Sequence, residues 1–456
     1  MRRVVLLSSV FVMMVNATVV IIALPTITDH FSFHDSTGHW LITVVFLTLA
    51  VLTPAVDSIA ARFSVRMLFM FGIAIFLVGT IAAALAPHFV IILLARVVQG
   101  FGTAVIMVLA SSTGSSTVVG LLGFGLGPVV AGLVLFIATW QWVFWAMVPI
   151  VVVIGLAGVL SLPTAGGAQG ESFDGFSAVL LACAFVALIY TLNDLSSLWV
   201  PPVVIIGLIA LSIFIIRQLQ HGRSHRAFLD LRPLEFPIFV LSLVVLMALA
   251  GGMFGGMSLI ALYLQQAFNA SPVLAAVLVA PLGILPAVMS PVAASMYARV
   301  GPRLLIFAGM VLVAGSFFWM SSLDRDAQLW LVAVIVSVCS LGLAMACAPL
   351  RLAAFEALPD TLQSSGWRWL GTLLPLGGAA GIATMSGWYW QVLTGITDLT
   401  LPEVATFAGN VTFFDAGLLG LLPLVLGLFI TRRPPNGSDG TQALGPTTAP
   451  TGHKFH

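Results

Sequence analysis

Long apolar segments recur along almost the whole chain, separated by short polar connections. About 20 residues of α-helix are needed to cross the ~30 Å hydrocarbon core of a bilayer. Fourteen segments reach that length, so the pattern predicts an all-α integral membrane protein with fourteen transmembrane helices. The predicted spans are residues 4–27, 40–60, 67–87, 89–110, 118–138, 142–162, 175–195, 198–216, 236–266, 271–297, 303–322, 328–349, 366–389 and 410–431.

The distribution of basic residues predicts the orientation of these helices. Lys and Arg in short loops are retained on the cytoplasmic side of a membrane. Of the 17 Lys and Arg residues, all fall on one side except Arg96, which lies within a span, and Arg325. We therefore expect both termini in the cytoplasm, which an even number of spans requires. The run after Arg2 and Arg3 is too long for a signal peptide and lacks a cleavage site, so it is expected to remain as the first helix.

Composition supports this interpretation and narrows the function. The chain is 60% hydrophobic and 7% charged, with a mean hydropathy of +1.14, which excludes a water-soluble enzyme. A net charge of +1 leaves no basic surface for nucleic acid. No Gly-x-x-x-x-Gly-Lys motif occurs and the one lysine is Lys454, so no nucleotide is expected to bind. The spacings of nucleophiles, cysteines and histidines indicate no enzyme activity, cofactor or metal site.

An internal repeat indicates the domain organisation. Residues 61–68 (ARFSVRML) match residues 298–305 (ARVGPRLL) at an offset of 237, and each copy is a basic loop between the second and third span of a six-helix block. We predict two six-helix bundles related by pseudo-symmetry, residues 1–162 and 236–431. Residues 163–235 would supply two extra helices and a basic loop, and residues 432–456 a disordered cytoplasmic tail. Repeated halves are typical of transporters that rock around a central site.

Four stretches resemble the motifs of a known family. They are residues 16–25 (NATVVIIALP), residues 62–66 (RFSVR), residues 96–102 (RVVQGFG), and the pattern formed by Gly123, Gly127, Pro128 and Gly132. With these motifs the chain, from about residue 10 to 430, resembles the major facilitator superfamily, specifically its fourteen-span drug:proton antiporter branch. The resemblance implies an efflux transporter with a proton-coupled cycle. The stretch at residues 111–117 is short and uncharged, whereas members of that branch have a longer basic loop.

Two family acids are replaced in this chain. The first-helix motif of the branch begins with Asp, whereas this chain has Asn16, which cannot titrate. The family loop between helices 2 and 3 carries Asp where this chain has Ala61. Asp57 lies four residues earlier on the same helical face, and we hypothesise that it replaces that carboxylate and pairs with Arg62 or Arg66. Simple drift is the alternative. The repeat adds Arg299 and Arg303 to this predicted gate loop.

Arg96 is the strongest single candidate for a functional residue. A charge inside a span costs at least ~2.5 kcal/mol, so Arg96 is expected to face the protein interior. At 1.5 Å per residue it lies about 10 Å below the outer face, and Asn16 lies about 12 Å below it. The two side chains are therefore predicted to be neighbours. The alternative is a structural arginine bonded to backbone carbonyls.

Glycines and a proline mark the fifth helix. Gly123 and Gly127 form a small-xxx-small face that allows close helix approach, and Gly132 extends the pattern. Pro128 is expected to free a backbone carbonyl and to bend the helix. We favour a hinge or seal here over plain packing.

Other ionisable residues are weaker candidates. Asp415 is predicted to lie about 8 Å below the outer face and is the remaining proton site within a span; the alternative is a helix-end acid that reaches water. In the first outer loop, the spacing of His30, His34, Asp35 and His39 fits no metal motif. A solvated loop is the favoured interpretation there, ahead of a metal site or a pH sensor.

Together these features predict a secondary transporter of a bacterial plasma membrane. It would export amphipathic organic compounds in exchange for protons by alternating access, without a cofactor and as a monomer. The expected pathway residues are Asn16, Thr18, Arg96, Gln99 and Asp415. Two alternatives stay open: an uncoupled carrier of organic anions attracted by Arg96, and a transporter-like sensor that has lost turnover.

Overall fold

The computed structural model describes residues 1–32, 36–60, 62–164, 174–222, 228–396 and 400–430. These residues form sixteen α-helices and no strand. The N-terminal half is α1 (Arg2–His30), α2 (Trp40–Ala60), α3 (Val65–Ala84), α4 (Phe89–Ala110), α5 (Ser116–Ile137), α6 (Trp142–Trp145) and α7 (Met147–Ser161). Next come α8 (Gly175–Asn193) and α9 (Val200–Gly222). The C-terminal half is α10 (Pro237–Gln266), α11 (Pro272–Val279), α12 (Pro281–Val300), α13 (Pro302–Met320), α14 (Leu329–Glu356), α15 (Gln363–Gly395) and α16 (Leu401–Gly427).

The sixteen helices make fourteen crossing segments, which confirms the predicted all-α fold. Two predicted spans, 142–162 and 271–297, are each broken into two helices. A proline lacks the N–H of the helical ladder and clashes with the carbonyl four residues back. Pro149 therefore explains the break after Trp145, and Pro281 explains the break between α11 and α12. Among the described residues, thirteen crossing segments are both long and apolar enough to span a membrane. The fourteenth, α15, is long enough but less apolar.

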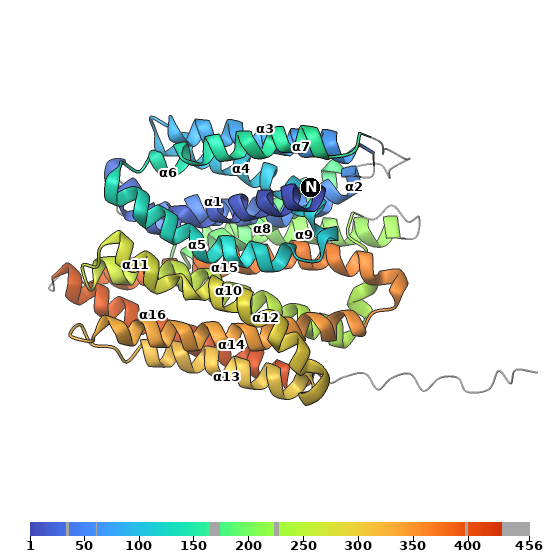
Figure 1. Ribbon diagram of the computed structural model, residues 1–456. Coiled ribbons are helices and arrows are strands. Elements are labelled where there is room, and N and C mark those ends of the chain that lie inside the picture. Colours follow the sequence, from blue (N-terminus) through green and yellow to red (C-terminus); the bar gives the residue numbers. More distant parts are fainter. Residues whose placement is uncertain (33–35, 61, 165–173, 223–227, 397–399, 431–456) are drawn as a thin grey trace, which may run out of the picture.

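The helices lie roughly parallel, with the N-terminal half above the C-terminal half in Figure 1. Two contacts dominate the interface between the halves. Helix α2 packs along α15, and α5 packs along α11 and α12. Helix α8 packs against α2 and α15 and pairs with α9. The predicted domain boundaries fall in the connections before α8 and before α10, and their role as boundaries of moving bodies stays a prediction. The predicted tail lies outside the described residues.

The two ends of the bundle differ in charge. We call the end that carries the N-terminus, the α2–α3 connection and the α12–α13 connection the basic end, because Arg2, Arg62, Arg66, Arg299 and Arg303 gather there. The opposite end carries the 3-10 turn η1 (Ser36–His39), which packs against α1, α2 and α15. The interface between the halves thus reaches both ends of the molecule.

Candidate substrate and proton pathway

Arg96 lies at the meeting point of the first four helices and is fully buried. Its Nε donates to the Leu41 carbonyl of α2 at 2.9 Å. Its Nη1 donates to the side-chain Oδ1 of Asn16 at 2.9 Å and lies 3.1 Å from the Asn16 carbonyl, and Nη2 lies 3.2 Å from the Ala17 carbonyl. Arg96 therefore ties α4 to α1 and α2, and the predicted contact with Asn16 is confirmed.

Gln99 extends this network to the third helix. Its Oε1 accepts from Arg96 at 2.8 Å, and its Nε2 donates to the Thr80 hydroxyl of α3 at 3.0 Å. A continuous chain of hydrogen bonds thus runs from Asn16 through Arg96 and Gln99 to Thr80. None of the described partners of Arg96 is a carboxylate. Carbonyl and amide dipoles, and not a counter-charge, therefore stabilise the guanidinium. The Asn16 Nδ2 is buried and has no hydrogen-bond partner.

Helix α5 lies directly against α1 because two of its glycines leave room. A Cβ on Gly123 would lie 2.5 Å from the Phe11 carbonyl, and one on Gly127 would overlap the Thr18 hydroxyl. Pro128 has no N–H to offer the Phe124 carbonyl four residues back. The Thr18 hydroxyl lies 3.2 Å from that carbonyl, across the helix interface, and 3.1 and 3.3 Å from the Met14 and Val15 carbonyls of its own helix. The carbonyl expected to be freed by Pro128 thus has a hydroxyl donor of α1 within hydrogen-bonding distance.

The other side of α5 contacts the C-terminal half. A Cβ on Gly125 would lie 2.8 Å from the Ala280 carbonyl and 3.0 Å from the Gly283 Cα, and one on Gly132 would lie 3.0 Å from the Pro272 carbonyl. Gly125 was not among the residues predicted from the sequence. Gly125 is two residues from Gly123 and from Gly127, which is a rotation of about 200° around the helix. This spacing is the sequence signal for a second helix face made of small residues.

Three phenylalanines meet at the centre of the interface. Phe254 of α10 lies edge to face with Phe46 of α2 and Phe124 of α5, at centroid distances of 4.4 and 4.5 Å. Phe254 also lies over Gly378 of α15, whose Cβ would be 3.0 Å from the ring. We call Phe46, Phe124 and Phe254 the central aromatic cluster. An apolar run gives no sign of which phenylalanines meet, so sequence reasoning did not find it.

At the basic end an ion pair joins the halves. Arg368 Nε of α15 lies 2.6 Å from Asp57 Oδ2 of α2. Close by, a Cβ on Gly371 would lie 2.7 Å from the Thr53 methyl, so the backbone of α15 approaches α2 closely. The sequence hypothesis named Arg62 or Arg66 as the partner of Asp57, and the structure instead places Arg368 there, on the other half.

The connection before α10 also holds the start of α15. The Asp230 carboxylate accepts from Arg232 and from Ser365, and Trp369 donates to the Asp230 carbonyl. Desolvation raises the pKa of the Asp230 carboxyl, but hydrogen bonds from Arg232 and Ser365 and the charge of Arg232 outweigh it and hold the pKa below its ordinary value. Asp230 thus remains a carboxylate that positions α15 near the ion pair.

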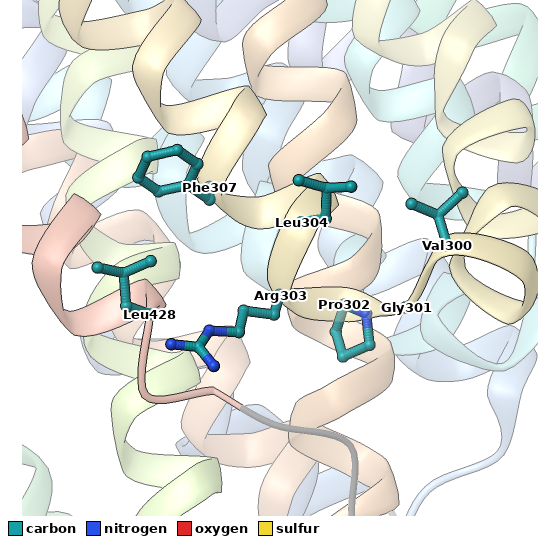
Figure 2. A pocket seen from close by; sticks show the side chains of 7 residues that line it. All are labelled: Val300, Gly301, Pro302, Arg303, Leu304, Phe307 and Leu428. Carbon is teal, nitrogen blue, oxygen red and sulfur yellow. The ribbon is translucent and has the colours of Figure 1, made fainter.

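The remaining predicted gate residues lie at the basic end but apart from this ion pair. Arg66 donates to the Val159 carbonyl of α7 and so closes the N-terminal half on itself. Arg299 is exposed. Arg303 lines a shallow surface pocket and extends toward Leu428, just after α16 (Figure 2). Gly301 makes the turn before it with a positive φ of 83°, which favours glycine.

At the opposite end a second polar contact joins the halves. His39 of η1 is 2% exposed, and its Nε2 accepts from Trp390 Nε1 of α15 at 3.0 Å. The expected solvated loop is therefore wrong for His39, because Trp390 and the ends of α1 and α2 enclose it. His30 is exposed as expected, whereas His34 and Asp35 lie outside the described residues.

Asp415 lies further along its helix than predicted. Helix α16 begins at Leu401 and not at residue 410, since Thr400 and Glu403 form a capping box that starts the helix earlier. Asp415 is thus fourteen residues into the helix, about 21 Å from its start and near the middle of α16. The predicted start at residue 410, which placed Asp415 five residues into the helix, is therefore wrong, and its depth below the outer face stays a prediction.

The sequence profile of the Major Facilitator Superfamily matches residues 6–382. The chain belongs to this superfamily. It is therefore a multi-pass membrane transporter and not a member of an enzyme family, as the motifs of α1, α4 and α5 predicted. The superfamily motif residues described above, Arg96, Gly123, Gly127 and Pro128, all form contacts within the N-terminal half.

Several relatives of this superfamily member are drug-resistance proteins. It is 27% identical to the lincomycin resistance protein LmrB of Listeria innocua over 448 residues, covering 92% of this chain and 94% of the relative. It is 27% identical to the multidrug resistance protein B homolog of Mycobacterium tuberculosis, covering 82% and 73%. It is 23% identical to the riboflavin transporter RibZ of Clostridioides difficile, covering 93% and 96%.

Solved structures of other transporters support the fold of this superfamily member. A bacterial homolog of the human lysosomal transporter Spinster, in an inward-facing and unoccupied conformation, matches with a TM-score of 0.63 at 15% identity, covering 94% of this chain and 97% of that chain. A peptide transporter POT matches with a TM-score of 0.61 at 15% identity, covering 94% of each chain. At this identity the likeness establishes the fold and nothing about the substrate.

Proposed function

We propose that the protein exports amphipathic organic compounds across a bacterial plasma membrane in exchange for protons, by rocking residues 1–162 against residues 236–431. One observation carries the proposal: α15 makes a polar contact with the N-terminal half at each end, Arg368 with Asp57 of α2 and Trp390 with His39 of η1. Alternating access requires two closures that can open separately. Because one chain supplies both halves, a monomer suffices.

The proposed orientation follows from the basic residues. The basic end, with both termini, lies in the cytoplasm under the rule that Lys and Arg are retained there. The Asp57–Arg368 ion pair is then the inner closure and the His39–Trp390 hydrogen bond the outer closure. A partly exposed ion pair contributes ~0.2–1 kcal/mol, so substrate binding can readily overcome the inner closure.

The proposed substrate class follows from the centre of the interface. The central aromatic cluster joins the halves through ring contacts alone, and a flat apolar compound can replace Phe254 against Phe46 or Phe124. Two of the relatives named above are resistance proteins, which supports export over uptake. When the halves separate during the transport cycle, the polar part of the substrate would contact the unpartnered Nδ2 of Asn16.

The proposed proton site is Asp415. It is the acid near the middle of α16, and no described hydrogen bond or ion pair engages it. Arg96 and Gln99 would act by holding α1 to α4 in register. The organic-anion alternative is less well supported, because the guanidinium of Arg96 is buried and its donors face protein acceptors.

Proton exchange in inverted vesicles tests the proposal. The lumen is acidified, a pH-sensitive dye is enclosed, and cationic, neutral and anionic amphiphiles are added in turn. We expect alkalinisation of the lumen with one or more cations, lost in Asp415→Asn and in Arg96→Ala and retained in Asp326→Asn, a control acid that is exposed in the α13–α14 connection. Equilibration of a labelled anion without any proton movement would instead support an uncoupled carrier, and absence of both signals would support the sensor.

A further inference from the structure

His39 is a buried histidine placed between the two halves. It ends the turn η1, immediately before α2, and its one described hydrogen bond crosses to Trp390 of α15. Helix α15 of the C-terminal half packs against α2 and η1 of the N-terminal half, so this contact lies on the interface. It joins η1 to α15 at the end that the proposed orientation places outside.

The hydrogen bond determines the protonation state of the ring. Trp390 Nε1 is a donor only, so His39 Nε2 must present its lone pair and carry no proton. The proton of the neutral ring is then on Nδ1, which is buried and has no hydrogen-bond partner. A charged ring would place its Nε2–H against the indole N–H, so that Nδ1, Nε2 and the Trp390 nitrogen would all be donors without acceptors. The closed contact therefore excludes the protonated ring.

Other ionisable groups near this contact are exposed or engaged elsewhere. At the outer end of α1, Asp29 and His30 are exposed, and His30 lies against Phe31 and Trp140. On α15, Tyr389 donates to Gln266. After α8, Asp194 accepts from Ser196 and lies 3.4 Å from the amide of Gln391. On α2 the one ionisable group is Asp57, at the basic end. None of the described hydrogen bonds or ion pairs of these groups reaches His39.

We propose that His39 and Trp390 form a proton-operated latch, in which protonation of His39 from the outer solution opens the outer end of the transporter. Histidine is the side chain that changes charge between pH 5 and 8, so the latch responds to the acidity outside an ordinary cell. The charged ring is stable only where water reaches it, which requires the outer ends of α15 and of η1 to separate. External acid thus favours the outward-open state. The inference rests on the proposed orientation but on no particular substrate.

Accessibility of a buried outer position measures the state of the latch. Ser386 is 1% exposed and lies one turn below Trp390 on the same face of α15, and its hydroxyl has no partner. The Ser386→Cys thiol, in a background without Cys183, Cys339 and Cys347, is labelled in intact cells with a membrane-impermeant maleimide. The labelling rate is divided by that of Ser322→Cys, an exposed position in the α13–α14 connection, because thiol reactivity itself depends on pH.

The latch predicts a definite pH response. We expect the normalised labelling of Ser386→Cys to rise by roughly tenfold between about pH 8 and pH 5.5. His39→Gln keeps an acceptor near the position of Nε2 but cannot titrate, so labelling should stay low at both pH values. Trp390→Phe removes the donor, and labelling at about pH 8 should rise by roughly threefold to tenfold, the equivalent of one hydrogen bond.

Each result bears on a separate claim. A native pH response that persists in His39→Gln, or no response in the native background, would overturn the latch. Failure of Ser322→Cys to react in intact cells would instead overturn the proposed orientation. In that case the same thiol should react in inverted vesicles. Because no substrate is added, the outcome is independent of whether proton-driven export is found.

Discussion

Asn16 occupies the position at which the antiporter branch that the sequence resembles has an acid. Its Oδ1 lies 2.9 Å from Arg96 Nη1, in the place where a carboxylate would form an ion pair. The buried guanidinium is nevertheless fully engaged by carbonyl and amide oxygens. The network thus keeps four helices together without a titratable partner, so α1 and α4 are held in the same way at every pH.

Asn16→Asp should add proton coupling to this network. A carboxylate at this position would pair with Arg96 and release it on protonation, so we expect the efflux rate to depend more steeply on pH, by roughly threefold or more between about pH 6 and pH 8. Efflux of a fluorescent substrate from loaded cells measures the effect. Asn410→Asp, which adds an acid to α16 where Asn410 contacts the Leu323 carbonyl, is the control. An unchanged pH profile in Asn16→Asp would mean that this position is no vacant coupling site.

At the residue scale the sequence predicted which charged residues matter better than it predicted which residues they contact. Arg96 stood out because a charge in an apolar run must be satisfied inside the protein, and helix geometry placed Asn16 beside it. Asp57 was found by its spacing, but its partner Arg368 is 311 residues away, where no local pattern points. His39 was named among the residues of the first outer loop, but a solvated loop was favoured because periodicity assigns no buried face at the edge of a polar loop.

Helix α5 combines two close contacts through different faces. Gly123 and Gly127 face α1, whereas Gly125 and Gly132 face α11 and α12. The freed Phe124 carbonyl lies within hydrogen-bonding distance of Thr18, a residue of α1. Any rocking of one half against the other must therefore slide along the second face while the first face stays fixed.

A double-mutant cycle tests the link between Thr18 and Pro128. Thr18→Val should destabilise the protein by ~1 kcal/mol, because the Phe124 carbonyl loses its donor. Pro128→Ala restores an N–H to that carbonyl, so adding Thr18→Val to Pro128→Ala should cost much less. Unfolding midpoints of the four proteins in detergent measure the coupling. Strictly additive effects would mean that Thr18 packs against α5 without serving the carbonyl.

At the scale of elements, apolar length predicted the helices and failed at their ends. All fourteen segments were found, since a span needs about 20 apolar residues. The breaks at Pro149 and Pro281 each depend on one proline inside a span, and the early start of α16 depends on a capping box. The length of an apolar run predicts neither feature.

The whole molecule depends on whether α2 and α15 can part at either end. The internal repeat predicted two halves, but pairwise repeats contain no information about which helices meet. In the structure α2 packs along α15, and a polar contact joins α15 to the N-terminal half near each end. Their separation at the basic end is therefore expected in every transport cycle.

A disulfide across the basic end should stop transport. A Cβ on Gly371 would lie 3.7 Å from the Thr53 Cβ, within the range of a disulfide. In a background without native cysteines, the pair Thr53→Cys and Gly371→Cys should lose nearly all efflux on oxidation and regain it on reduction. Either single variant should not respond to oxidant.

A cross-link within one half is the matched control. A Cβ on Gly420 of α16 would lie 3.4 Å from the Ala314 Cβ of α13, and both helices belong to the C-terminal half. Oxidation of Ala314→Cys with Gly420→Cys should leave efflux intact. If both cross-linked pairs behave alike, the halves do not move as separate bodies.

The polarity of α15 has a consequence for how the protein is made. This helix is the one crossing segment that lacks the apolar character of a self-sufficient span, with buried Thr372, Ser386 and Tyr389 along it. A nascent segment of this kind gains little by entering lipid alone. Its partners α2, α8 and α10 are all synthesised before it. We therefore expect α15 to insert only after most of the bundle is in the bilayer. Contacts with other helices, more than contact with lipid, would then stabilise the helix on which both closures depend.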